Sequence, residues 1–366
     1  MKTIMIISTA RSDFSHLNLI IRELRQSNIV EVIFTAAGSH FDISRGCSIG
    51  EIEQSGVSVD YTLEHKIEWH DGATLSTSLT RLQQELTVLI RETQTDYIMV
   101  LGDRIELISV LIPVLISDVK LIHISGGEET GCIDDKIRNL LSLTADISFT
   151  SGELFSENLI RMKGSSRNIY NAGDPALENI DRMAMRPLDD INREFGLELK
   201  EQMYILFTFH PETDTDIPVE KQIRGALEFL SSTERNVLCT APNSDIGGDY
   251  ILDSIKAISN ERNNIYFCPH LGYVNYISLL ASAGAGMGNS SSLVIEAPYL
   301  RTPSVLIGSR QNGRPLADSI FQSGYSVRDI EKALTSAVSF RGDITMCYER
   351  KDTAAIIRET LEQIIG

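Results

Sequence analysis

The sequence has 366 residues, of which 42% are hydrophobic and 23% are charged. This length accommodates two domains of about 150–200 residues each. The composition is that of an ordinary globular protein, which excludes disordered and fibrous classes. The formal net charge of −17 argues against a nucleic-acid partner, because binding phosphates requires clustered lysine and arginine.

Targeting and redox signals predict a cytoplasmic protein that does not enter a membrane. The N-terminal run MKTIMIIST is too short for the hydrophobic region of a signal peptide, so we expect a strand there. The longest apolar stretch, at 107–116, is interrupted by Ser109 and Pro113 and falls short of the ~20 residues that a membrane helix needs. The five cysteines are scattered without a CxxC spacing, so we expect neither a disulfide framework nor a zinc site.

Short apolar runs alternate with amphipathic segments through the first half of the chain. The predicted strands are at 3–8, 30–36, 60–63, 97–101 and 120–124, and the predicted helices are at 13–25, 73–93 and 104–116. Such alternation is typical of a parallel sheet with helices on both faces. Ligands of such sheets bind beyond the carboxyl ends of the strands.

The alternation pauses between residues 174 and 200, a charged segment with two prolines, and we place a domain boundary there. It resumes with strands at 204–209, 236–240, 264–267, 283–287 and 304–307 and helices at 220–231, 250–259, 273–280 and 292–300. We therefore predict an α/β protein with an N-terminal domain at 1–175 and a C-terminal domain at 176–350. We expect residues 351–366 to form a helix that crosses back to the first domain.

Polar motifs follow predicted strands of the first half. Arg11 lies in TARSDF after the first strand, His40 lies in GSH after the second, and Asp103 and Arg104 lie in GDRIE after a later one. Taken singly, Arg11 could be a solvated loop residue and His40 an ordinary loop histidine. Because the carboxyl ends of parallel strands face one crevice, we expect these side chains to converge on a site.

The densest motif is HISGGEETGCIDDKIR, at 123–138. Its glycines allow the backbone to approach a ligand closely. Glu128, Asp134 and Asp135 crowd carboxylates into one loop and the start of a helix, which suits general acid/base chemistry. The simpler alternative is that Asp134 only caps the helix.

Three motifs of the second half indicate an anion site. His210 follows a strand in FHPET, and residues 288–292, GNSSS, precede a predicted helix that carries Glu296. Backbone N–H groups and serine hydroxyls at a helix start bind anions, so we predict a diphosphate cradle there. Arg310 and Arg314, in GSRQNGR, supply cations after another strand, unless they are ordinary surface arginines. The glycines at 284–288 have the wrong spacing for a dinucleotide fingerprint, so no NAD is implied.

In this order and over nearly the whole chain, these motifs resemble those of hydrolysing UDP-N-acetylglucosamine 2-epimerases of sialic acid synthesis. They also resemble relatives that act on the bacillosamine-type sugar of legionaminic acid synthesis. The motifs that carry the resemblance are TARSDF, GDRIE, HISGGEETGCIDDKIR, FHPETD, GNSSSLVIEAP and GSRQNGR. The resemblance implies a GT-B-like fold of two Rossmann-type, doubly wound domains with the active site in the interdomain cleft. It also implies a homodimer that acts on a nucleotide sugar and needs no cofactor and no metal.

The reaction implied by the resemblance is an elimination followed by hydration. A base removes the C2 proton, UDP leaves C1 to give a 2-acetamidoglycal, and water then adds with inversion at C2. The expected catalytic residues are Asp103, Glu128, Asp134 and His210. The residues expected to bind the UDP-sugar are Arg11, His40, Arg104, Asn289, Ser290, Ser291, Glu296, Arg310 and Arg314.

Three departures from the family pattern leave the sugar and the choice between UDP and GDP open. Ser125 replaces the first glutamate of HIEGGE, and we expect Glu128 to compensate. Asn139 replaces a histidine, and Leu143 stands in the place of a lysine. Because other residues also replace this glutamate in the legionaminic branch, the change at Ser125 points to the substrate more than to inactivity.

Two alternative functions remain open. A GT-B glycosyltransferase would share the UDP cradle but transfer the sugar to an acceptor, and the carboxylate-rich loop argues against it. A degenerate nucleotide-sugar-binding protein would explain the three departures without turnover. A periplasmic sugar-binding protein is disfavoured because no signal peptide is expected.

Overall fold

The computed structural model describes residues 1–42, 47–64, 67–69, 71–243 and 245–366. The chain divides into two compact units. The first unit contains residues 1–129, 133–181 and 348–366, and the second contains residues 130–132 and 182–347. The chain thus enters the second unit briefly at 130–132 before it crosses again at 182.

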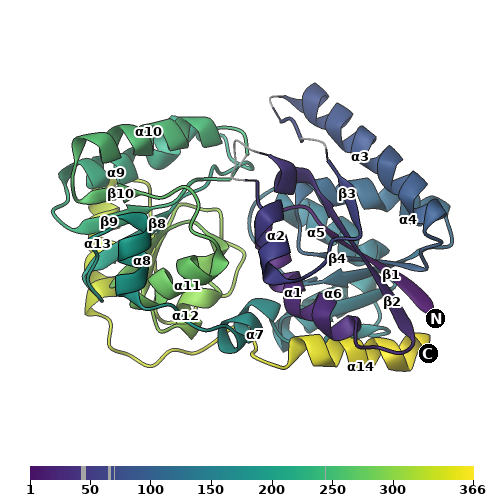
Figure 1. Cartoon of the computed structure of the whole chain (residues 1–366). Helices are drawn as coiled ribbons and strands as arrows, with labels where there is room; N and C mark the ends of the chain where they lie inside the picture. The colour runs from purple at the N-terminus through teal and green to yellow at the C-terminus, as the bar shows by residue number, and fades with distance from the viewer. Residues whose placement is uncertain (43–46, 65–66, 70, 244) are drawn as a thin grey trace. The chain divides into compact units, whose positions relative to one another are not determined.

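The first unit is built on a parallel sheet with seven strands among the described residues, in the order β3-β2-β1-β4-β5-β6-β7 (Figure 1). The strands are β1 (Lys2–Ser8), β2 (Val30–Ala37), β3 (Tyr61–Leu63), β4 (Tyr97–Leu101), β5 (Lys120–Ile124), β6 (Ile147–Thr150) and β7 (Ile169–Asn171). The helices are α1 (Arg11–Leu24), α2 (Ile49–Ser55), α3 (Gly72–Glu92), α4 (Leu111–Ile116), α5 (Asp134–Thr144), α6 (Glu153–Lys163), α7 (Pro175–Arg182) and α14 (Thr353–Ile365). Side chains alternate along β1, so Ile4 and Ile6 join a core cluster with α1 and α14, whereas Met5 and Ile7 join one with α3 and α5. Helices therefore cover both faces of the sheet.

The second unit has a six-stranded parallel sheet within its described part, in the order β10-β9-β8-β11-β12-β13. Its strands are β8 (Tyr204–Thr208), β9 (Asn236–Cys239), β10 (Ile265–Phe267), β11 (Ala285–Gly288), β12 (Ser304–Ile307) and β13 (Ile320–Ser323). Its helices are α8 (Leu188–Phe195), α9 (Val219–Ser232), α10 (Gly248–Glu261), α11 (Tyr273–Ser282), α12 (Glu296–Tyr299) and α13 (Val327–Ser339). The prediction of two doubly wound parallel sheets is confirmed.

Two predicted helices are shorter than expected. The helix predicted at 104–116 is a 3₁₀ helix at Ile105–Val110 followed by α4, and the one predicted at 292–300 is a 3₁₀ turn at Ser291–Leu293 followed by the four-residue α12. Pro113 and Pro298 lack the backbone N–H that a continuous α-helix needs in its interior. The strands β6, β7 and β13, of three or four residues each, were not predicted.

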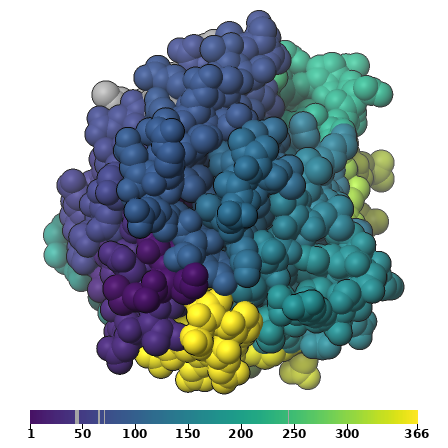
Figure 2. Space-filling model, turned by 90° about the vertical axis from the view of Figure 1, so that its right-hand side faces the viewer, coloured from purple at the N-terminus to yellow at the C-terminus, as the bar shows by residue number. Residues whose placement is uncertain are grey.

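The end of the chain lies on the first unit. Helix α14 packs against α1, and its Ile357 and Leu361 are buried in the same core cluster as Leu17 and Leu24. Figure 2 shows the C-terminal residues in yellow beside the N-terminal residues in purple. None of the helices in the described part of the chain has the length and hydrophobicity that crossing a lipid bilayer requires.

Candidate active site

The loop between β1 and α1 is organised by Asp13. This buried carboxylate accepts hydrogen bonds from the backbone N–H groups of Thr9 and Ala10, both at 2.9 Å, and from the Ser8 hydroxyl at 2.7 Å. A carboxylate in the first turn also interacts favourably with the helix macrodipole. These hydrogen bonds fix the loop that leads into Arg11, the first residue of α1. The Arg11 side chain is 40% exposed, and its Nη1 lies 3.6 Å from Glu51 Oε1.

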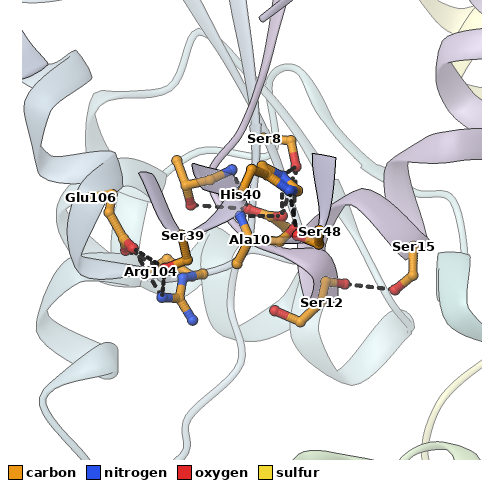
Figure 3. A network of polar contacts seen from close by, with 11 residues as sticks. Ser8, Ala10, Ser12, Ser15, Ser39, His40, Ser48, Arg104 and Glu106 are labelled. Carbon is orange, nitrogen blue, oxygen red and sulfur yellow. Dashed lines mark hydrogen bonds and ion pairs between the residues drawn. The ribbon is translucent and has the colours of Figure 1, made fainter. Parts of the chain in front are cut away.

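His40 is fully buried, and its ring lies between Ser8 and Ser48 (Figure 3). Its Nε2 lies 2.8 Å from the Ser8 hydroxyl oxygen and its Nδ1 lies 2.8 Å from that of Ser48. Because Ser8 donates its proton to Asp13, Nε2 carries the histidine proton and Nδ1 accepts from Ser48. Burial lowers the pKa of His40, which favours this neutral form. These contacts make His40 a link between the ends of β1 and β2, and its predicted contact with UDP stays a prediction.

Arg104 is paired with Glu106 at the carboxyl end of β4. Its Nη2 and Nε donate to the two oxygens of the buried Glu106 carboxylate at 2.9 and 3.2 Å (Figure 3). The Ser39 hydroxyl donates to the same carboxylate at 3.3 Å, which joins this loop to the loop after β2. The structure therefore brings Arg104 and the GSH motif together, as expected for loops at one edge of a parallel sheet.

Asp103, the residue before Arg104, contacts a buried arginine that is not among the predicted site residues. Arg138, on α5, donates through Nη2 to Asp103 and lies 3.5 Å through Nη1 from Glu128. Asp134, the first residue of α5, lies four positions before Arg138 and hence on the same side of the helix. Two of the three expected carboxylates of the first unit, Asp103 and Glu128, therefore contact one guanidinium group, and Asp134 begins the helix that carries this group. Their catalytic roles stay predictions.

Glu128 is the most enclosed of these carboxylates. Its side chain is 2% exposed and accepts a hydrogen bond from the Ser151 hydroxyl at 3.1 Å and one from the Tyr348 hydroxyl at 3.4 Å. Tyr348 follows the crossing back from the second unit, more than two hundred residues along the chain. Arg138 could have been found from its i, i+4 spacing to Asp134, whereas no sequence pattern marks Tyr348.

His210 and Asn289 are joined in the second unit because they follow two paired strands. Thr208 of β8 lies beside Gly288 of β11, where a Cβ atom at Gly288 would lie 1.8 Å from the Thr208 carbonyl oxygen. The His210 N–H donates to the Asn289 side chain at 2.7 Å, and Asn289 Nδ2 donates back to the His210 carbonyl at 2.8 Å. The Asn243 backbone N–H donates to His210 Nδ1 at 3.0 Å, so neutral His210 carries its proton on Nε2 and can donate it to a ligand.

Hydroxyl groups gather around Ser290. The Ser292 hydroxyl donates to the Ser290 oxygen at 3.0 Å, and the Tyr276 hydroxyl lies 2.6 Å from the Ser292 oxygen. Ser291 begins the 3₁₀ turn, and buried Glu296 begins the four-residue α12. Because these elements are so short, the macrodipole argument for the predicted diphosphate cradle is weak. An anion would depend on hydroxyl and backbone donors instead.

The loop at 308–314 lies beside Asn289. Gln311 Nε2 donates to the Asn289 carbonyl at 3.1 Å. The same loop carries Arg310, which is half-buried, and Arg314, which is buried. The second unit therefore brings together His210, Asn289 and the loop that carries both predicted cations. Across the described residues, no group of three His, Cys, Asp or Glu side chains is arranged to hold a metal ion.

Proteins similar to this chain act on nucleotide sugars according to their names. A Legionella pneumophila protein named UDP-N,N'-diacetylbacillosamine 2-epimerase (hydrolyzing) is 24% identical over 338 residues, covering 92% of this chain and 89% of that protein. A Campylobacter jejuni protein named GDP/UDP-N,N'-diacetylbacillosamine 2-epimerase (hydrolyzing) is 27% identical over 335 residues, covering 91% of this chain and 86% of that protein.

The fold is shared with solved structures. The crystal structure of UDP-GlcNAc 2-epimerase from Neisseria meningitidis bound to UDP-GlcNAc has a TM-score of 0.82 at 15% identity, covering 99% of this chain and all of that chain. The predicted GT-B-like fold is confirmed by this similarity. The family model described as UDP-N-acetylglucosamine 2-epimerase matches residues 22–362. Since this match spans nearly the whole chain, the protein belongs to the UDP-N-acetylglucosamine 2-epimerase family.

Proposed function

We propose that this protein is a hydrolysing 2-epimerase, which converts a UDP-N-acetylhexosamine to UDP and the free sugar with inverted configuration at C2. The observation that carries the proposal is the Asp103 carboxylate at the end of β4, paired with buried Arg138 in a chain of this family. A carboxylate that is oriented yet 21% exposed suits a group that exchanges a proton with a substrate.

The proposed chemistry is an elimination and a hydration. The C2–H bond and the C1–O bond to the diphosphate break, and a 2-acetamidoglycal and UDP form. Water then adds its oxygen to C1 while a proton returns to C2 from the opposite face. Because the C2 proton is weakly acidic, the leaving diphosphate must be stabilised as the proton departs.

We assign the proton transfers to the expected acid/base set of Asp103, Asp134 and Glu128, and hydrogen-bond donation to His210. The hydrogen bond that His210 Nδ1 accepts from the Asn243 N–H leaves Nε2 as the nitrogen that carries a proton, and this supports the donor role. The remaining expected residues bind the nucleotide and sugar: Arg11, His40, Arg104, Asn289, Ser290, Ser291, Glu296, Arg310 and Arg314. Arginine suits diphosphate binding because its guanidinium group forms charge-assisted hydrogen bonds with phosphate.

For the sugar, we propose UDP-N-acetylglucosamine or the 2,4-diacetamido-2,4,6-trideoxy sugar, used for sialic or legionaminic-type acids. Ser125, in place of a glutamate, supports the diacetamido sugar, as do the names of two relatives. Leu143 is 51% exposed on α5, so its hydrophobic side chain offers no polar group to a substrate. The test is release of nucleotide from UDP-N-acetylglucosamine, UDP-diacetylbacillosamine and its GDP counterpart.

Isotopes separate this reaction from its alternatives. In D₂O, an elimination through a glycal must leave deuterium at C2, and ¹⁸O from water must appear in the sugar and not in UDP. A free sugar with protium at C2 would show plain hydrolysis and contradict the proposal. A glycosyltransferase would leave the donor intact without an acceptor, and a binding protein would retain UDP-sugar without turnover. The family match does not favour the glycosyltransferase.

We also propose that the enzyme is a homodimer in the cytoplasm. Exposed hydrophobic side chains on the adjacent helices α4 and α5 support a self-association surface: Ile112, Leu115, Ile116, Leu140 and Leu143. Light scattering of the wild type and of Leu115→Glu tests this proposal. The proposed surface would be contradicted if the wild type were a monomer, or if the Leu115→Glu variant remained a dimer.

A further inference from the structure

The segment at 348–352, called here the return segment, is where the chain re-enters the first unit before α14. We propose that the return segment helps to hold the Asp103 carboxylate in place, through a buried chain of contacts from Tyr348 to Glu128 to Arg138 to Asp103. Tyr348 and Arg138 then act as positioning residues, and Glu128, a member of the proposed acid/base set, connects them. This inference rests on the proposed catalytic role of Asp103.

The return segment is firmly attached to the first unit. The Glu349 N–H donates to the Ser151 carbonyl at 3.0 Å, and the Asp174 N–H donates to the Glu349 carbonyl at 2.8 Å. The Tyr348 ring packs against Phe155 with 5.0 Å between ring centroids and is almost completely buried. Backbone hydrogen bonds and ring packing therefore fix where the Tyr348 hydroxyl lies.

Tyr348 and Ser151 both act on the Glu128 carboxylate. The Ser151 hydroxyl donates to Oε1 at 3.1 Å and the Tyr348 hydroxyl donates to Oε2 at 3.4 Å. Ser151 also accepts the backbone hydrogen bond of the return segment. The two donors are thus coupled, and each oxygen of this buried carboxylate has a hydroxyl partner.

Glu128 in turn holds Arg138, which contacts Asp103. The Arg138 side chain is 3% exposed, so it needs carboxylate partners to remain charged inside the protein. Its planar guanidinium group offers one nitrogen to Glu128 and another to Asp103, and this fixes the direction of the Asp103 contact. Asp103 is the most exposed member of this chain of contacts, whereas the Arg138 side chain is 3% exposed and is therefore not expected to touch a substrate.

The chain of contacts should affect turnover more than binding. A displacement of a reacting group by about 1 Å can reduce a rate by about 100-fold. Tyr348→Phe removes the 3.4 Å hydrogen bond to Glu128 and should lower kcat ~3–10-fold. Arg138→Lys replaces a guanidinium group that contacts two carboxylates with a single ammonium group, and it should lower kcat ~100-fold. KM for the UDP-sugar should stay within about twofold in both variants, because neither side chain is predicted to touch substrate.

The test compares Tyr348→Phe and Arg138→Lys with Tyr170→Phe, which removes a hydroxyl elsewhere in the first unit. Steady-state kinetics gives kcat and KM, and hydrogen–deuterium exchange measures protection of amides at 101–106. We expect lower kcat and faster exchange in the first two variants and neither effect in the control. Exchange does not depend on turnover. An inactive wild type would contradict the proposed function, whereas unchanged exchange, unchanged kcat or a change confined to KM would overturn the positioning role.

Discussion

Glu212 accepts two hydrogen bonds from Ser309, one from its backbone N–H at 3.0 Å and one from its hydroxyl at 2.5 Å. The Tyr325 hydroxyl donates to the same carboxylate at 2.8 Å. Burial and the Glu212 carboxylate raise the pKa of Tyr325 to about 12, so this hydroxyl remains a donor at neutral pH. Glu212 therefore anchors the start of the loop that carries Arg310 and Arg314.

We predict that Glu212→Gln weakens UDP binding. The side-chain NH₂ group of the glutamine would face Ser309 and Tyr325, which are themselves hydrogen-bond donors. Because the charge-assisted hydrogen bonds to the carboxylate are lost, the dissociation constant for UDP should rise by about tenfold. Calorimetric titration with UDP measures the change. Glu228→Gln, at an exposed position on α9, is the matched control. Equal affinities in the two variants would show that the anchor does not matter for binding.

We predict that Asp103→Asn loses at least ~100-fold in turnover while UDP binding survives, since a general acid/base typically contributes ~10²–10⁴-fold. Nucleotide release and calorimetric titration measure the two quantities on the same preparation. Turnover equal to that of the wild type would remove Asp103 from the catalytic set.

We predict that Arg310→Ala chiefly weakens UDP binding, by ~1.5–3 kcal/mol if its hydrogen bond to phosphate is charge-assisted. Arg328→Ala, at an exposed position on α13, removes the same charge from the second unit and should leave the affinity unchanged. An unaltered dissociation constant in Arg310→Ala would place this side chain outside the binding site.

We predict that His123 makes the protein less stable as the pH falls below neutrality. Burial lowers its pKa to about 4, against the opposing effect of its 2.8 Å hydrogen bond to the Gly102 carbonyl. Since an unfolded histidine has a pKa of about 6.5, the unfolded chain binds a proton that the folded chain does not between about pH 6.5 and pH 4. The free energy of unfolding should therefore fall through this window as acid is added, and no further loss should arise from this group below it.

His123→Gln keeps an amide donor for Gly102 but does not titrate. Urea unfolding at about pH 7 and about pH 5 should show a smaller loss of stability in this variant than in the wild type. His270→Gln, at an exposed position, is the control and should lose as much stability as the wild type. Identical losses in all three proteins would mean that His123 does not carry this pH dependence.

The alternation of apolar and amphipathic segments in the sequence was enough to predict the α/β class. It also predicted that the polar motifs lie together at the carboxyl ends of the strands. The alternation of Ile4 and Ile6 with Met5 and Ile7 requires both faces of β1 to be covered, and helices on both faces follow from it. Because the strands are parallel, motifs at their carboxyl ends had to share an edge. The contact of Arg104 with Ser39 is an example of this.

The hydrogen bonds that hold the candidate site residues in place could be found only from the tertiary structure. The pairings of Tyr348 with Glu128 and of Ser309 with Glu212 join residues 220 and 97 positions apart, and no local periodicity encodes such contacts. The sequence by itself determined which chemical groups were available and which strand ends carry them. Only the folded chain decided which carboxylates face a guanidinium group and which nitrogen of His210 holds the proton, because burial and distant hydrogen-bond partners set both.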